Sequence, residues 1–144
     1  MGTRSRVIFV TLFGAALAFA PGAGAGGYVV LVNASNQVTS LSHSELKHVV
    51  LGATKQWSNG AVVQVGIIPG DAPETQYFGS LLDLTPRELL ARIQEAVFKG
   101  ELRRPAVLRS SADCVAMARA GAGAICVASD GEALPPEVHV VTVH

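Results

Sequence analysis

The sequence carries little charge and no excess of either sign. Lysine and arginine together number 11, aspartate and glutamate together number 11, and charged residues make up only 15% of the chain. A nucleic-acid-binding protein typically has a clustered basic face, which this balance does not favour. The local basic group formed by Arg103, Arg104 and Arg109 is interpreted as a solvated loop. The sequence therefore predicts no nucleic-acid partner.

Motifs of catalysis and of metal or cofactor binding are also missing. The four histidines, His43, His48, His139 and His144, do not have the spacing of metal ligands. On a helix, His43 and His48 would point to different sides, because their separation matches neither neighbouring position on a helical face. The chain has no nucleophile-elbow motif and no G-x-G-x-x-G motif after a strand. We predict a non-enzymatic protein without catalytic residues, metal site or cofactor.

Cysteine is scarce, with only Cys114 and Cys126 in the chain. Cys114 falls on the last predicted helix, and Cys126 falls on the strand that follows it. In an exported protein the two could form a disulfide. Alternatively, they are two small buried hydrophobic residues.

The first 25 residues have the pattern of a secretory signal peptide. Arg4 and Arg6 supply a positive start, Val7–Ala20 is an uncharged and mostly apolar run, and Ala23–Ala25 offers small residues for cleavage. The apolar run is too short to cross a bilayer core of about 30 Å as a helix. We predict cleavage after Ala25 and a periplasmic or secreted protein, with an uncleaved N-terminal anchor as the alternative. The remaining residues 26–144 are enough for one domain.

The stretch around which the domain is organised begins at Tyr28–Val32, a compact apolar run that predicts a buried strand. A helix is predicted to follow, with Ser42 as its N-cap. Ser42 and Glu45 have the spacing of a capping box, in which each side chain satisfies a free backbone N–H at the start of the helix. Gly52 is expected to end this helix, because glycine readily adopts the left-handed cap conformation.

The same signals recur further along the chain. Ala61–Ile68 predicts a second buried strand, and Asp71 followed by Glu74 predicts another capped helix. Thr85 and Glu88 predict a third. The remaining predicted elements are an extended piece at Ala106–Leu108, a small helix capped by Ser110 or Ser111, and strands at Ala124–Ala128 and Val138–Val143. This alternation of strands and helices predicts one α/β domain with a central sheet flanked by helices.

Two segments carry a resemblance to a known family. The first is VNASNQVTSLSHSELKHVVLGATKQWSNG, with the phrase L-G-x-x-x-x-W at Leu51, Gly52 and Trp57. The second is FKGELRRPAVLRSSADCVAMARAGAGAICVAS, with an F-x-G phrase at Phe98 and Gly100, a proline, a serine-capped helix and a Gly-Ala-Ile phrase. Together they resemble the shorter relatives of the phosphate ABC transporter substrate-binding proteins. The resemblance extends over nearly the whole of residues 26–144.

The resemblance implies a fold and a function. The expected fold is a single lobe of a type 2 periplasmic-binding-protein-like fold, whereas the transporter proteins carry two lobes that close on a ligand. The chain is too short for two lobes, since domains usually have about 100 residues or more each. The implied function is an exported, solute-binding-like domain of phosphate transport. Its implied partners are a small anion such as phosphate and a membrane permease or another exported protein.

One segment departs from the family pattern. In the family, a strand delivers an arginine that is followed by a Gly-Ser-Gly-Thr turn, and the helix N-terminus there binds the anion. Here Ile68 occupies the arginine position and the turn falls on Asp71–Glu74. We expect Asp71 to cap the helix and fill the anion site with its own side chain, while Glu74 adds repulsion. The candidate ligand-binding residues of this turn are Asp71, Ala72, Pro73, Glu74 and Thr75.

This degenerate turn leaves two hypotheses for the function. In the first, the domain is solute-binding-like and binds phosphate or another small anion weakly. In the second, it is an exported protein-interaction or regulatory domain that has kept the fold and lost the ligand.

Overall fold

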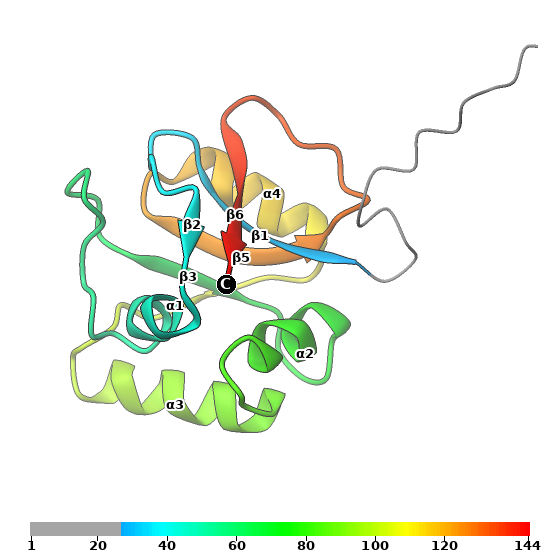
Figure 1. Ribbon diagram of the computed structural model, residues 1–144. Coiled ribbons are helices and arrows are strands. Elements are labelled where there is room, and N and C mark those ends of the chain that lie inside the picture. The colour runs from blue at the N-terminus through cyan, green and yellow to red at the C-terminus, as the bar shows by residue number, and fades with distance from the viewer. Residues whose placement is uncertain (1–26) are drawn as a thin grey trace, which may run out of the picture.

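The computed structural model describes residues 27–144 (Figure 1). The predicted signal peptide at residues 1–25 lies outside this range. Strands and helices follow one another in the order β1 (Tyr28–Asn33), β2 (Ser40–Leu41), α1 (His43–Val50), β3 (Gln64–Ile67), α2 (Pro73–Ser80), α3 (Pro86–Phe98), β4 (Ala106–Val107), α4 (Ser111–Ala120), β5 (Ala124–Ser129) and β6 (Val138–Val143). Within the described range, no helix is long and apolar enough to cross a membrane.

The strands form one mixed sheet in the order β2-β6-β1-β5-β3-β4. Strand β1 is antiparallel to both of its neighbours, with Leu31 opposite Cys126 of β5 and Val140 of β6. The other neighbouring strands pair in parallel. All strands except β1 therefore run in the same direction, and their C-terminal ends meet at one edge of the sheet. We call this edge the carboxyl edge.

Helices cover both faces of the sheet, as predicted (Figure 1). Helix α4 packs on one face, over a core that contains Leu31, Cys126 and Ala128. Helices α1, α2 and α3 pack on the other face, over the larger core that contains Val30 and Ile125. The alternation of side chains along β1 and β5 sends successive residues to opposite cores. The predicted fold class, a central sheet flanked by helices, is confirmed.

The predicted starts of α1 and α3 are confirmed to the residue. Ser42 Oγ accepts a hydrogen bond from the Glu45 N–H at 3.0 Å, and Glu45 Oε1 accepts one from the Ser42 N–H at 3.1 Å. Thr85 and Glu88 exchange the same pair of bonds, each at 3.2 Å. The hydrogen bonds from Ser42 also hold the pKa of the Glu45 carboxyl below its ordinary value of 4.5.

The structure shortens one predicted strand and decides between the alternatives left open at other elements. Strand β3 is shorter than the predicted Ala61–Ile68, because Val62 instead forms an isolated bridge with Gln56. Ser110 is the N-cap of α4, and Ser111 is its first helical residue. The predicted extended piece at Ala106–Leu108 is confirmed as the two-residue strand β4, and the two-residue strand β2 was not predicted. Cys114 and Cys126 form a disulfide that joins α4 to β5, which decides between the two interpretations of the cysteines.

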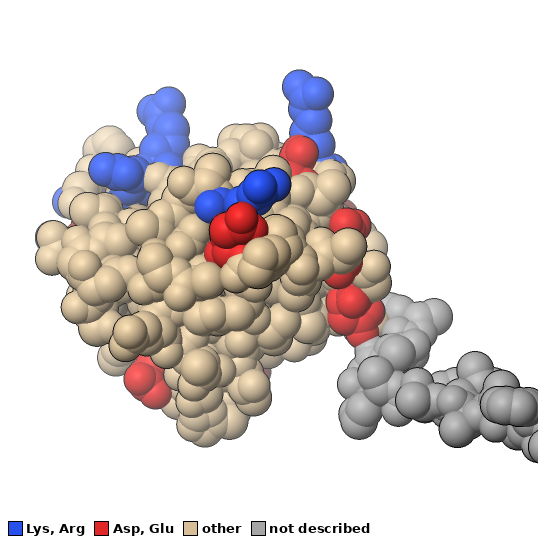
Figure 2. Space-filling view, turned by 90° about the horizontal axis from the view of Figure 1, so that it is seen from above, with Lys and Arg blue, Asp and Glu red and all other residues tan. Residues whose placement is uncertain are grey.

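Charged side chains are sparse on the surface as well. Figure 2 looks down on the molecule from the top of Figure 1 and shows a few acidic and basic residues on a mostly uncharged face. Arg119 and Glu137 form a loose ion pair with 3.8 Å between Nη2 and Oε1.

Candidate functional site at the carboxyl edge

The carboxyl edge contains the point where the chain leaves the sheet toward opposite faces. Strand β3 continues into α2 on one face, and its neighbour β4 continues into α4 on the other (Figure 1). In open α/β sheets, ligands bind outside the carboxyl ends of the strands at such a switch point. The predicted anion turn, Asp71–Thr75, lies between the end of β3 and the start of α2. The fold therefore places the turn where this class of sheet presents a ligand.

Three internal contacts hold this turn in place. Ile68, directly after β3, is 8% exposed and packs in the smaller core beside Leu108. The buried Thr75 hydroxyl donates a hydrogen bond to the Ile68 carbonyl. Gln76 Nε2 donates to the Asp71 carbonyl at 2.8 Å. The backbone of the turn is thus fixed by the protein itself, without any ligand.

The prediction that Asp71 caps α2 is wrong. The N-cap is Ala72, and it makes no side-chain hydrogen bond to the helix. Proline explains the shift. Pro73 has a fixed φ and no N–H, which suits it to the first helical position and moves the cap to the residue before it. Asp71 is exposed and lies outside the helix, so its carboxylate does not cap the helix N-terminus as expected.

Helix α2 therefore differs from the other helices of residues 27–144. Ser42, Thr85 and Ser110 each cap their helix through a side-chain oxygen. The N-terminus of α4 has a second hydrogen bond of this kind, because Asp113 Oδ2 accepts one from the Arg109 N–H at 2.9 Å. The first turn of α2 has no side-chain cap, although Glu74 brings a negative charge to it. An uncapped first turn presents backbone N–H groups and the positive end of the helix dipole.

The turn itself holds no cation, but the neighbouring strand brings one to the same edge. Ile67 of β3 is paired with Val107 of β4, and the Leu108 N–H donates to the Ile67 carbonyl at 2.8 Å. Arg109 and Pro69 each follow two residues after the end of their strand, β4 and β3, so both lie just beyond the carboxyl ends of a parallel pair. Sequence reasoning missed this placement, because Arg109 is far from the turn in sequence and was interpreted as part of a solvated loop.

The gap that borders the turn is too small for a ligand. The concavity bordered by Ile68, Glu74, Thr75 and Leu108 has a volume of about 0 Å³. Ligand pockets usually enclose about 300–1,000 Å³. This gap therefore offers no enclosed site for a ligand beside the turn.

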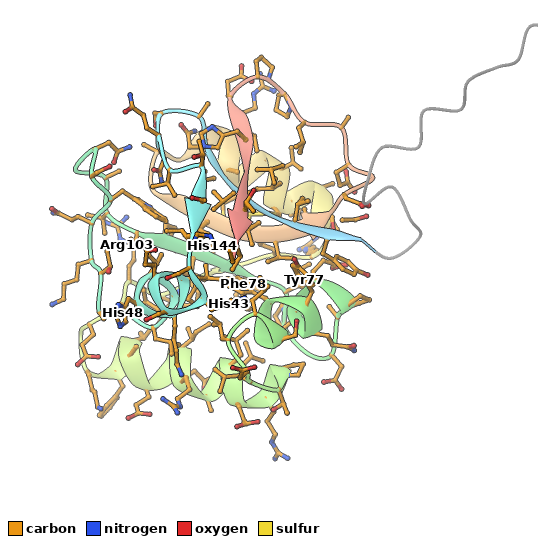
Figure 3. All side chains as sticks on the ribbon, viewed as in Figure 1. His43, His48, Tyr77, Phe78, Arg103 and His144 are labelled. Carbon is orange, nitrogen blue, oxygen red and sulfur yellow. A yellow bond between two sulfur atoms is a disulfide. The ribbon has the colours of Figure 1, made fainter. Side chains whose placement is uncertain are left out.

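The histidines do not gather into a metal site within residues 27–144. Figure 3 shows His43, His48 and His144 around α1. His43 Nδ1 lies 2.7 Å from the Leu81 carbonyl and must donate to it, since a carbonyl only accepts. His139 Nε2 lies 2.9 Å from the Val38 carbonyl in the same way. These contacts tie loops and strands together.

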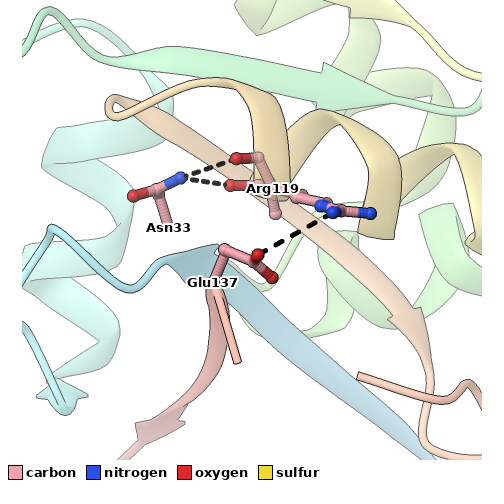
Figure 4. A network of polar contacts seen from close by, with 4 residues as sticks. Asn33, Arg119 and Glu137 are labelled. Carbon is pink, nitrogen blue, oxygen red and sulfur yellow. Dashed lines mark hydrogen bonds and ion pairs between the residues drawn. The ribbon is translucent and has the colours of Figure 1, made fainter. Parts of the chain in front are cut away.

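Several residues of the family phrases lie away from the carboxyl edge and hold the scaffold together. The Trp57 indole N–H donates to the Gly123 carbonyl at 2.9 Å, and both residues are buried. A Cβ atom at Gly123 would lie 1.8 Å from the Val62 carbonyl oxygen. Asn33 Nδ2 donates to the carbonyls of Ala118 and Arg119 at the end of α4, as Figure 4 shows. These contacts stabilise the scaffold without involving a ligand.

Comparison with known proteins supports the fold. No protein-family model matches the sequence, and no curated protein matches it. Among solved structures, the chain is similar to an ABC-type phosphate transport receptor from Vibrio cholerae, with a TM-score of 0.62 and 19% sequence identity. The two proteins share a fold. The match covers 81% of this chain and 45% of the receptor, so the chain corresponds to less than half of that protein's length.

Proposed function

We propose that the chain is an exported, non-enzymatic lobe of the phosphate-receptor type, with a degenerate anion site at Asp71–Thr75. The lobe binds phosphate or a related small anion only weakly by itself. The observation that carries this proposal is the first turn of α2, which lacks a side-chain cap and lies at the carboxyl edge. A helix N-terminus in this state favours an anion through its N–H groups and its dipole.

Three features of the same turn make the binding weak. Ile68 is apolar and buried where the resembled family has an arginine, so no guanidinium comes from β3. Glu74 places a negative charge in the first turn, where it competes with an anion for the helix dipole. The surface encloses no volume, so a bound anion would keep much of its water. The two-lobed arrangement of the resembled family would supply the missing half of the enclosure.

The disulfide supports the export part of this proposal. Cys114 and Cys126 are both fully buried and covalently joined. Disulfides form and persist mainly in the periplasm and outside the cell. This agrees with the signal-peptide pattern of residues 1–25.

The second candidate function is a protein-interaction or regulatory domain that has lost the ligand. It is favoured by a large exposed aromatic residue, Phe98, which lies at the end of α3 and is 93% exposed. In this candidate, the fold serves only as a support for a binding surface elsewhere on the molecule.

A nuclear magnetic resonance titration with phosphate distinguishes the two candidates. In the first, phosphate at millimolar concentrations shifts the amide signals of Glu74 and Thr75 before others. The double variant Asp71→Ser with Glu74→Thr removes two carboxylates and adds hydroxyls at the turn. Each charge near a helix end contributes about 0.3–1 kcal/mol. The affinity of this double variant for phosphate should therefore exceed that of the wild type by a few-fold to some tens of fold.

The control is the double variant Glu95→Thr with Glu101→Thr, which removes the same charge at and beyond the C-terminal half of α3. It should leave the phosphate affinity unchanged. Equal gains in both double variants would mean that net charge, and not the α2 turn, governs the binding. Amide shifts confined to other parts of the surface would contradict the proposed site.

A further inference from the structure

The phrase F-x-G contains a residue that the fold does not explain. Gly100 ends α3 with a φ of 72°, a conformation that glycine adopts without strain. Phe98, two residues earlier, is 93% exposed. Val107 of β4 is 72% exposed. Both side chains border the same groove, so two large apolar residues are exposed side by side on one small part of the surface.

This groove has a volume of about 380 Å³ and runs between the C-terminal half of α3 and β4. Its apolar walls come from Ile93 and Val97 of α3, and from Pro105 and Val107 at the sheet edge. Its volume falls in the range of about 300–1,000 Å³ that is usual for ligand pockets. It shares no residue with the anion turn.

A partner would not bind by adding a strand to the sheet beside β4. Strand β4 is the last strand of the sheet and has two residues. The Leu108 N–H already donates to Ile67 of β3, Pro105 has no N–H, and the Arg109 N–H donates to Asp113. Only Val107 keeps an outward N–H and carbonyl, because neighbouring residues in a strand point in opposite directions. The short, blunted edge leaves side chains as the means of contact.

The charge of the groove indicates the chemistry of the partner. Its lining includes the Arg104 side chain and no carboxylate. Within residues 27–144, Arg104 forms no ion pair. A second copy of the chain would bring the same uncompensated guanidinium groups toward each other. An acidic partner would compensate them instead.

We propose that the groove between Phe98, Arg104 and Val107 is a docking site for an acidic, amphipathic segment of another protein. The segment inserts an apolar side chain between Phe98 and Val107 and places a carboxylate against the Arg104 guanidinium. Aromatic and arginine side chains are the residues that most often dominate the binding energy of protein interfaces. This proposal is independent of phosphate binding, because it uses a separate surface.

Selection of random peptides displayed on phage tests the proposal directly, with residues 26–144 as the immobilised protein. The enriched peptides should combine a large apolar residue with neighbouring Asp or Glu. Binding of a synthetic enriched peptide, measured by fluorescence anisotropy, should weaken about ten-fold or more with Phe98→Ser, as expected for a central interface residue. The charge reversal Arg104→Glu should weaken the acidic peptide similarly and shift a repeated selection toward basic peptides.

Matched controls are Val140→Ser, which removes an apolar side chain of 41% exposure on β6, and Arg87→Glu, which reverses a charge at the start of α3. Both should leave the peptide affinity unchanged. Failure to enrich peptides, enrichment of peptides without carboxylates, or insensitivity to both groove variants would overturn the proposal. Sedimentation that shows a dimer of the wild type and a monomer of Phe98→Ser would also overturn it, because the groove would then receive a second copy.

Discussion

At the residue scale, two glycines of one turn differ in whether the fold can accept a side chain in their place. Gly123 follows α4 and approaches the backbone of the Ala61–Val62 segment so closely that no side chain fits between them. Its carbonyl also accepts the hydrogen bond of the buried Trp57 indole. Gly121, two residues earlier, has a φ of −120° and only ordinary contacts around its Cβ position. The same turn thus holds one glycine that is sterically required and one that is not.

These two positions give a matched pair of predictions. Gly123→Ala forces the Val62 backbone to move and should lower the free energy of unfolding by about 2 kcal/mol or more. Gly121→Ala should be neutral or stabilising by about 0.4–1 kcal/mol, because it restricts the unfolded chain. Urea unfolding of both variants and the wild type provides the measurement. Equal losses in the two variants would show that the close approach at Gly123 is not a constraint.

The cap of α3 offers a second prediction for a single residue. Thr85→Ala removes the oxygen that accepts the Glu88 N–H and should cost about 1 kcal/mol of stability. Thr85→Ser keeps that oxygen and should unfold at nearly the same urea concentration as the wild type. If all three proteins unfolded together, the hydrogen bond between Thr85 and Glu88 would have no role in stability.

At the scale of elements, local signals in the sequence predicted α1 and α3 best. Each has an N-cap and a partner three residues later, and this chemistry acts within one turn of chain. The prediction for α2 failed at the cap, because Asp71–Glu74 has the same spacing but Pro73 moves the first helical position. The extended piece predicted at Ala106–Leu108 is strand β4, whereas β2 was not predicted, since two residues carry no periodic pattern and its pairing depends on a distant strand.

The candidate site was only partly predictable for the same reason. The sequence singled out the turn Asp71–Thr75 as the candidate site, and its role in binding an anion stays a prediction. It did not bring Arg109 to the same edge, because that placement depends on the pairing of β3 with β4. Nor could the exposure of Phe98 be predicted, since its place in the F-x-G phrase says nothing about what packs around it.

The uncapped start of α2 leads to a prediction at this scale. Ala72→Ser places a hydroxyl at the N-cap and should stabilise the protein by about 1 kcal/mol. The same hydroxyl accepts an N–H of the first turn, so phosphate should bind more weakly than to the wild type. The control Ala116→Ser, on the exposed side of α4, should instead lower stability by up to about 0.5 kcal/mol and leave phosphate binding unchanged. A stabilised Ala72→Ser variant with unchanged phosphate affinity would place the anion elsewhere.

At the scale of the whole molecule, export is the first question. The positive start, the apolar run and the Ala23–Ala25 site predict that the exported protein begins at Gly26. N-terminal sequencing of the protein recovered outside the cytoplasm checks this directly. Recovery of membrane-bound protein that still begins with Met1 would support the uncleaved anchor instead.

Residues 27–144 form one domain, and the gap beside its anion turn has a volume of about 0 Å³. Its scaffold residues, such as Trp57 and Gly123, keep the sheet and helices together independently of the anion turn. The fold can therefore persist whether or not the turn binds a ligand. This separation of scaffold and site is the reason that a likeness in fold does not by itself assign phosphate binding to the chain.

Calorimetric titration of residues 26–144 with phosphate tests the central claim most directly. Because Ile68 supplies no guanidinium, Glu74 brings a negative charge to the first turn of α2 and the gap beside the turn has no volume, we expect no saturable binding at sub-millimolar phosphate. A micromolar dissociation constant for the wild-type monomer would contradict the account and would indicate a complete phosphate receptor in a single lobe.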